Sequence, residues 1–361
     1  KLLSGIEDIY CDYTNGAFEK YDKKLINTAI PYDQRGSSFS KAKLNSLSPL
    51  LSELRLIKSS EELENLKKAC DITVEGHKSA MEFTKKDMYE YQIEAEMEKT
   101  FYDLGAERLG YPSIVASGDN ACILHYSTNR EKVDNNGLIL IDAAAEFKMY
   151  SSDVTRTFPV SGKFTKVQKD VYTEVLNAQE LGIKNVTTKK TMSDIHTSTV
   201  ASISQSLVDL GLVPMGVEET ISMMHYFEFF MHGTGHWLGL DVHDAGTTEE
   251  KNKPRKLKPG MVTTIEPGIY IRPNKPEIEF KLLERDPKKI RERRKSLGME
   301  KATKLESEEM KDAKSIKHKI PKDLLGIGIR IEDDIVCTEN DPINLTTGAP
   351  KTIDDVEAIC S

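Results

Sequence analysis

The order of the predicted elements, two helices followed by a block of strands and then the same order again, constrains the fold most. Apolar positions at helical spacing predict a first helix that opens with a Ser59/Glu62 capping box and a second that ends at Gly105. The strands that follow are predicted at 114–117, 123–126, 138–145 and 150–160. The second half repeats this order, with helices at 167–183 and 193–210 and strands at 230–236, 262–271 and 325–336. Two similar halves indicate an internal duplication with helices packed outside a shared sheet.

Two segments depart from this pattern. Residues 1–55 are weakly patterned and end in a Ser/Pro/Leu stretch at 46–54 that is compatible with a linker or a short helix. Residues from about 276 to 323 are dense in Lys, Arg and Glu, with a predicted helix at 287–296. We expect this segment to be a charged surface insertion between two sheet strands, with a partner-binding or regulatory role as the alternative.

Composition is that of an ordinary globular protein and narrows the possible partners. The 361 residues, 38% of them hydrophobic, suffice for one large core or for two domains. A net charge of −8 offers no concentrated basic face, so we expect no nucleic-acid partner. Apolar runs fall short of the roughly 20 residues of a membrane span, and no signal peptide is evident, so we expect no membrane association. Five widely spaced cysteines without a CxxC pair favour a reducing, cytoplasmic setting.

Five potential metal ligands lie in unusually apolar or glycine-rich surroundings: Asp142, Asp153, His236, Glu266 and Glu332. Buried ionised carboxylates are costly unless a cation or another partner compensates them. A turn centred between Phe147 and Lys148 would place Asp142 directly opposite Asp153, where a cation would relieve their repulsion. Alternatively, the turn lies elsewhere and each aspartate faces solvent. For Glu332, a salt-bridged surface pair with Arg330 on one strand face is the alternative to burial.

A cluster of histidines forms a second group of candidate functional residues. His232, His236 and His243 fall within twelve residues, and His125 lies upstream. In an extended segment His232 and His236 are about 13 Å apart, so at most one of them binds a given metal ion. The other, together with His243, is a candidate for substrate contact.

Six segments resemble, in order, the metal-dependent pita-bread peptidases, and among them the aminopeptidase P and prolidase group that cleaves beside proline. They are residues 122–126, 141–142, 152–156, 232–244, 264–268 and 328–333. The resemblance implies an α+β fold with two pseudo-symmetric halves and helices packed outside a curved, mainly antiparallel sheet. It implies a catalytic domain at 56–361, leaving 1–55 as an incomplete or reduced amino-terminal region, because full-length members carry a longer one.

The resemblance also implies a role for each candidate residue. Asp142 would be a terminal ligand of one metal ion, and Asp153 and Glu332 would bridge two ions. His236 and Glu266 would complete the coordination of the second ion, and Glu266 would also act as the catalytic base. Three histidines would line the substrate site and contribute to catalysis: His125, His232 and His243. Arg330 would support the carboxylates.

The expected function is metal-dependent hydrolysis of the bond before a penultimate proline, releasing the amino-terminal residue. Four carboxylates and one imidazole form a mainly hard-oxygen donor set, which suits two Mn²⁺ ions, with Zn²⁺ or Co²⁺ as alternatives. The expected partners are small peptides with proline in the second position, and a homo-oligomer is compatible with these features. The alternatives are an Xaa-Pro dipeptidase (prolidase), a methionine aminopeptidase, and a non-catalytic pita-bread module that binds a partner through the charged insertion.

Overall fold

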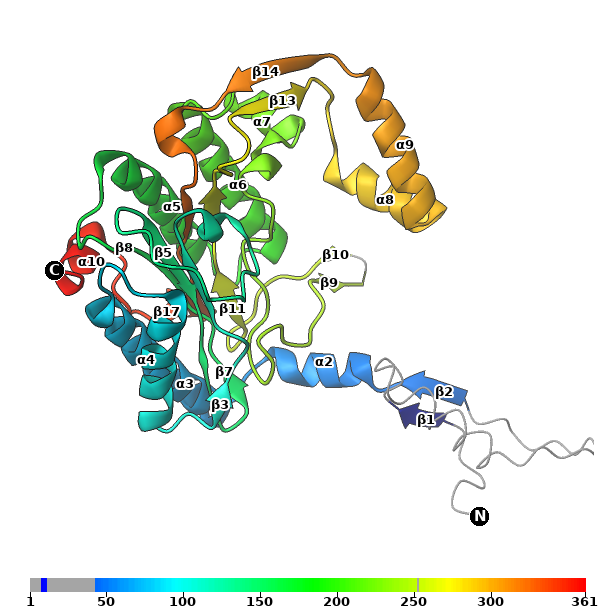
Figure 1. The fold of residues 1–361 in the computed structure, drawn as a ribbon. Helices are drawn as coiled ribbons and strands as arrows, with labels where there is room; N and C mark the ends of the chain where they lie inside the picture. The colour runs from blue at the N-terminus through cyan, green and yellow to red at the C-terminus, as the bar shows by residue number, and fades with distance from the viewer. Residues whose placement is uncertain (1–7, 12–42, 252) are drawn as a thin grey trace, which may run out of the picture.

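The computed structural model describes residues 8–11, 43–251 and 253–361 (Figure 1). The expected amino-terminal region at 1–55 therefore lies largely outside the described residues. Its described parts are β1 (Asp8–Cys11), which pairs in parallel with β2 (Lys43–Ser46), and α2 (Ser48–Leu56). The stretch at 46–54 thus contributes to a short helix, with its proline in the first turn, where no backbone hydrogen bond is lost.

The first half begins with the predicted pair of helices. In α3 (Ser60–Phe83) the capping box is present, because Glu62 N–H donates to Ser59 Oγ and Ser59 N–H donates to Glu62 Oε2. Helix α4 (Glu90–Asp103) packs against α3 and ends just before Gly105, whose φ of 96° suits glycine. Two antiparallel sheets follow in the orders β4-β5-β8 and β3-β6-β7. Their strands are β3 (Arg108–Leu109), β4 (Ile114–Ser117), β5 (Leu138–Asp142), β6 (Ala145–Phe147), β7 (Tyr150–Ser151) and β8 (Thr155–Pro159).

The second half repeats this order. Helices α5 (Lys166–Lys184) and α6 (Met192–Asp209) pack against each other, and each opens with a capping box. Short segments α7 (Val217–Ser222) and η2 (His225–Glu228) lead to the second set of strands, with β9 (Glu249–Glu250) and β10 (Lys253–Pro254) in a small hairpin. The main strands are β11 (Val262–Ile265), β12 (Gly268–Tyr270), β15 (Gly328–Arg330), β16 (Asp333–Val336) and β17 (Ile343–Asn344), all paired antiparallel. Helix α10 (Ile353–Ile359) follows.

Two predicted strands are wrong. Residues 123–126 form a turn after the 3₁₀ helix η1 (Gly118–Cys122), with Ile123 N–H donating to Asn120 O. Residues 230–236 run beside β11 without forming a strand, and the bridge between Trp237 and Thr263 follows them. The reason is a close approach of two backbones, since a Cβ on Gly235 would lie 1.9 Å from Thr264 O.

The predicted register of the first hairpin is also wrong. Phe147 pairs with Tyr150, so Lys148 and Met149 form the turn, both with positive φ as a two-residue hairpin turn requires. Because the turn lies one residue further along than expected, Asp142 pairs with Thr155 rather than with Asp153. The sequence lacked the Asn-Gly signal that usually marks such a turn.

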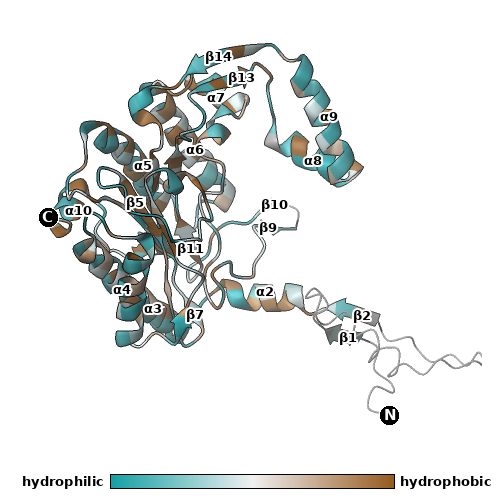
Figure 2. Ribbon diagram, viewed as in Figure 1, coloured by the Kyte–Doolittle hydropathy of each residue, from teal (hydrophilic) through white to brown (hydrophobic). Residues whose placement is uncertain are grey.

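The charged segment forms a protruding unit between β12 and β15 (Figure 1). Strands β13 (Glu277–Lys281) and β14 (Ser315–Lys319) pair antiparallel, and α8 (Pro287–Leu297) and α9 (Met299–Asp312) connect them as a helical pair. The short helix η3 (Lys322–Leu324) returns the chain to β15. Figure 2 shows α8 and α9 as predominantly hydrophilic, whereas β5 in the interior is hydrophobic. Among the described residues, no helix has both the length and the apolar character needed to cross a membrane.

A buried arginine joins the two halves. Arg156, in β8, is fully buried and pairs with Asp333 of β16, with 2.6 Å between Nη2 and Oδ1. Its Nη1 donates to the backbone oxygen of Glu332 at 2.6 Å, and its Nε and Nη2 donate to backbone oxygens near the carboxyl end. Burial alone would raise the pKa of Asp333, but Arg156 and Lys351 outweigh it and hold that pKa well below its usual range.

We expect Arg156→Met to lower the free energy of unfolding by roughly 3–5 kcal/mol, because it leaves Asp333 buried with one cation fewer. Arg293→Met is the matched control, since it breaks an arginine–carboxylate pair with Glu309 at the surface and should change little. Urea unfolding followed by circular dichroism measures both. Equal, small effects would mean that Arg156 is not a structural tie between the halves.

Candidate metal centre

The predicted ligands lie where strands end or are interrupted. Asp142 is the last residue of β5, and Asp153 lies in the gap between β7 and β8. Glu266 follows β11, directly before a proline that cannot continue the ladder of hydrogen bonds, and Glu332 lies between β15 and β16. His236 comes from the glycine-containing segment beside β11. Both halves of the fold therefore contribute side chains to one place.

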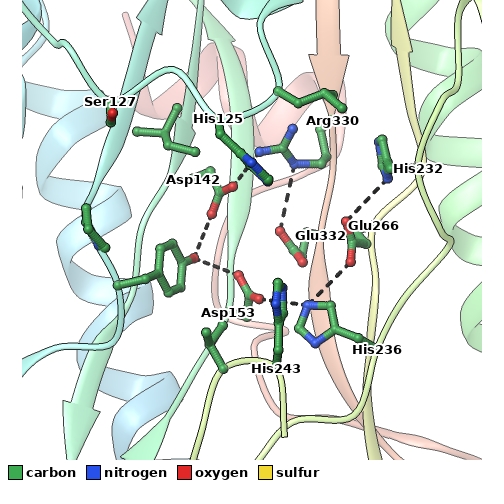
Figure 3. Close-up of a pocket in the computed structure, with 15 residues that line it drawn as sticks. His125, Ser127, Asp142, Asp153, His232, His236, His243, Glu266, Arg330 and Glu332 are labelled. Atoms are coloured by element: carbon green, nitrogen blue, oxygen red, sulfur yellow. Dashed lines mark hydrogen bonds and ion pairs between the residues drawn. The ribbon is translucent and has the colours of Figure 1, made fainter. Parts of the chain in front are cut away.

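All nine residues singled out from the sequence line one cavity of about 360 Å³ (Figure 3). They are Asp142, Asp153, His236, Glu266, Glu332, His125, His232, His243 and Arg330. The apolar part of the lining includes Leu124 and Val242. The fold thus brings together residues that are up to about two hundred positions apart in the chain.

Three of these residues form the tightest group. One ligand atom from each of Asp153, His236 and Glu332 lies within 4.8 Å of the other two, a spacing that can hold a metal ion. His236 Nε2 is 3.2 Å from Asp153 Oδ2 and 3.5 Å from Glu266 Oε1. Glu266 therefore adjoins this group through His236, and Asp142 adjoins it through the Tyr111 hydroxyl.

Asp142 is held by two residues outside this group. Arg330 Nη2 is 2.5 Å from Asp142 Oδ2, and the Tyr111 hydroxyl donates to Asp142 Oδ1 at 2.7 Å. The same hydroxyl is 2.6 Å from Asp153 Oδ1, so Tyr111 connects the two aspartates. The alternative of a surface pair between Arg330 and Glu332 is wrong, because both residues are buried and Arg330 pairs more closely with Asp142.

The cavity concentrates negative charge away from water. Burial raises the pKa of Asp142, and it raises that of Glu266 to about 7, with Asp153 adding to both shifts and nearby cations opposing them. Burial and the neighbouring carboxylates also raise the pKa of Glu332 well above its usual range. Burial opposes protonation of His236, but Asp153 and Glu266 together raise its pKa to about 9. A bound divalent cation would relieve this excess, so the donor set fits a metal ion.

The three other histidines face the same cavity. His232 Nε2 lies 2.8 Å from the Tyr270 hydroxyl and its Nδ1 is 3.5 Å from Glu266 Oε2. Burial, followed by Arg330, lowers the pKa of His232 to about 3, so this imidazole is neutral. The ring of His243 stands edge-on to that of His236, with 4.3 Å between centroids. His125 lines the same cavity (Figure 3).

Two tyrosines of the site were not found from the sequence. Tyr111 precedes β4 and is partly buried, and Tyr270 ends β12 and is fully buried. Tyr270 accepts a hydrogen bond from Arg330 Nη1 at 2.9 Å, which links it to the carboxylates. An isolated tyrosine is an ordinary core residue, and no spacing pattern connects either one to the acidic residues.

Comparison with known proteins agrees with this geometry. The sequence profile of metallopeptidase family M24 matches residues 64–339, which is most of the chain. The chain belongs to this family. M24 relatives include the Xaa-Pro aminopeptidase of Escherichia coli strain K12, 36% identical over 99% of this chain and 71% of that protein. The Xaa-Pro aminopeptidase of Haemophilus influenzae is 39% identical over 86% of this chain, which spans 62% of that relative.

Solved structures of aminopeptidase P share the fold. Aminopeptidase PepP of Pseudomonas aeruginosa superimposes with a TM-score of 0.83 at 35% identity, over 99% of this chain and 72% of that one. Escherichia coli aminopeptidase P with the inhibitor Pro-Leu gives a TM-score of 0.81 at 35% identity, with the same coverage of both chains. The fold is therefore the predicted pita-bread fold of the M24 hydrolases, which supports a divalent metal at the carboxylate and histidine cluster.

We expect a divalent metal to raise the melting temperature of this M24 protein by several degrees after chelator treatment, because a ligand that binds only the folded state stabilises it. Glu332→Gln should abolish this rise without destabilising the metal-free protein, since it removes one of several mutually repelling buried carboxylates. Glu357→Gln in α10 is the matched control, a buried glutamate that pairs with Lys163 and Lys169 instead. Differential scanning fluorimetry measures the response, and an undiminished rise in the Glu332 variant would exclude that residue as a ligand.

Proposed function

We propose that the chain is a metal-dependent Xaa-Pro aminopeptidase, which removes the first residue from peptides whose second residue is proline. The observation that carries the proposal is the convergence of four carboxylates and four histidines on one cavity. The names of the relatives support the same activity, since those of Escherichia coli and Haemophilus influenzae are Xaa-Pro aminopeptidases.

We propose five residues as ligands of two divalent ions: Asp142, Asp153, His236, Glu266 and Glu332. Mn²⁺ is the preferred ion. The prevalence of carboxylate oxygens supports Mn²⁺ over an ion that prefers thiolates. Within the proposal Asp153 and Glu332, one from each half of the fold, would contribute to holding both ions. The ions would polarise the scissile carbonyl and lower the pKa of a bound water.

The other side chains bind the peptide and move protons. In this proposal Glu266 takes a proton from the attacking water and returns it to the departing proline nitrogen. His243 is proposed to donate a hydrogen bond to the developing oxyanion. His125 and His232 line the space for the peptide, and Arg330 keeps the Asp142 carboxylate in place through its 2.5 Å contact.

A proline in the second position explains the need for a dedicated enzyme. The amide before proline has no N–H, so peptidases that hold their substrate through that group lose a hydrogen bond. A site that relies on the carbonyl and on the free amino group of the substrate avoids this loss. The dipeptidase reading shares the same catalytic residues, and only the length of peptide accepted separates the two.

The domain boundaries belong to this proposal. We propose residues 56–361 as the catalytic domain, with 276–323 as a surface insertion that leaves the cavity residues in place. The profile match at 64–339 supports the first boundary, and the antiparallel β13–β14 pair supports the second. Residues 1–55 would form an amino-terminal region separate from the catalytic domain, and the widely spaced cysteines support a cytoplasmic location.

The purified protein should cleave an Xaa-Pro-Yaa tripeptide and release the first residue, with activity lost on chelation and restored by Mn²⁺. An Xaa-Pro dipeptide of the same first residue is the matched comparison. Amino acid release followed by chromatography measures both. Dipeptide-only cleavage would favour a prolidase, and cleavage of neither peptide with Mn²⁺ present would favour a binding module.

Glu266→Gln should lower kcat by roughly 10²–10⁴-fold, because the amide cannot accept the proton of the attacking water. The metal content of the variant is measured by elemental analysis at saturating Mn²⁺, so that loss of a ligand is separated from loss of the base. Glu357→Gln should leave kcat unchanged. A near-normal rate in the metal-loaded Glu266 variant would show that another group is the base.

A further inference from the structure

The two aspartates that flank His243 have no part in the chemistry described so far. Asp244 is buried, and its backbone N–H donates to the oxygen of Trp237 at 2.9 Å. Asp241 is exposed, and its backbone oxygen accepts from Gly239 N–H at 3.2 Å. These contacts close the loop at 237–244, which carries His243 into the cavity.

Both aspartates pair with cations near the end of α2: Arg55 lies in its last turn, and Lys58 lies between α2 and α3. Lys58 Nζ lies 2.9 Å from Asp244 Oδ2, and both of these side chains are almost completely buried. Arg55 Nη2 lies 2.5 Å from Asp241 Oδ2 and also contacts Asp244 Oδ1. Two cations that are distant in sequence from the loop thus hold it on both sides of His243.

The Lys58–Asp244 pair occupies a tightly bounded space. A Cβ on Gly239 would lie 2.3 Å from Asp244 Oδ2 and 2.8 Å from Lys58 Cε, so only glycine leaves room for the pair. Gly239 O in turn accepts from Ser151 N–H at 2.9 Å, next to the strand gap that holds Asp153. The pair therefore fixes the loop against the wall of the cavity.

Burying the charged side chain of Lys58 costs desolvation free energy. Burial lowers the pKa of Lys58, and Asp244 opposes that shift. Buried ion pairs are often no more stabilising than apolar residues of similar size, and their best attested use is to select one arrangement. A role in fixing geometry accounts for the Lys58 charge better than a role in stability.

His243 depends on its backbone for its orientation. Within the described residues, its ring contacts the ring of His236 and has no hydrogen-bond partner of its own. Figure 3 shows the ring beside Asp153 and His236. Because no hydrogen bond from a described side chain fixes the imidazole, its orientation depends on the anchored loop.

We propose that Lys58 and Arg55 are positioning residues that hold His243 in its catalytic orientation through Asp244 and Asp241. The proposal rests on the proposed function, because it gives His243 a task in the reaction. Both cations precede residue 64, where the M24 profile match begins. The segment before the matched region thus takes part in setting the active site.

Lys58→Met removes the charge and keeps most of the side-chain length. It should lower kcat by roughly tenfold to a hundredfold at unchanged metal content, because small displacements of a catalytic group have effects of that size. In a His243→Ala background the same substitution should cause no further loss, since the group that it positions is gone. An equal loss in both backgrounds, or recovery of kcat at saturating Mn²⁺, would overturn the proposal.

Glu53→Gln is the matched control, because it weakens the ion pair between α2 and Arg255, which does not contact the His243 loop. It should leave kcat unchanged, whereas an equal loss would mean that any loosening of α2 has the same effect. If Lys58→Met fails to fold, Arg55→Gln, at a partly exposed side chain, takes its place in the same comparison.

Deuterium uptake tests the anchor without any substrate. Peptides covering 237–244 should exchange faster in Lys58→Met than in the unsubstituted protein or in Glu53→Gln, and unchanged uptake would overturn the proposal. If the unsubstituted protein cleaves no Xaa-Pro peptide, the proposed function fails, while this measurement still decides whether Lys58 anchors the loop.

Discussion

The buried guanidinium of Arg156 is the interaction on which the rest of the structure depends. It lies where β8 of the first half meets β16 of the second, and it pairs with Asp333 while it donates to the backbone of Glu332. Asp153 and Glu332 stand on either side of this junction. Without a fixed junction, carboxylates from two separate half-sheets could not stay within 4.8 Å of a common histidine.

The site gathers charges that a core normally excludes. Asp142, Glu266 and Glu332 all have raised pKa values, because they are buried beside one another. Arg330 and Tyr111 offset part of this cost through direct contacts with Asp142. The negative charge that remains uncompensated favours the binding of divalent cations to the folded chain. The free energy of folding and the affinity for metal are therefore coupled.

Local signals in the sequence predicted the helices well, and the site only in part. The Ser59 capping box and Gly105 defined helix ends because capping depends on neighbouring residues alone. Acidic residues in apolar runs identified side chains that the fold brings to one cavity. The segment at 230–236 was misassigned because its conformation depends on contact with Thr264, thirty residues away. For the same reason no pattern could connect Tyr111 to Asp142, or Lys58 to Asp244.

Residues outside the region matched by the family profile contact the residues that support the active site. Arg55 and Lys58 precede residue 64, whereas the Pro350 oxygen and Lys351, which complete the Arg156 and Asp333 network, follow residue 339. A fragment cut to the matched segment would keep every cavity residue and lose the supports on both sides. The contacts that support the site therefore span more of the chain than the region by which the family is recognised.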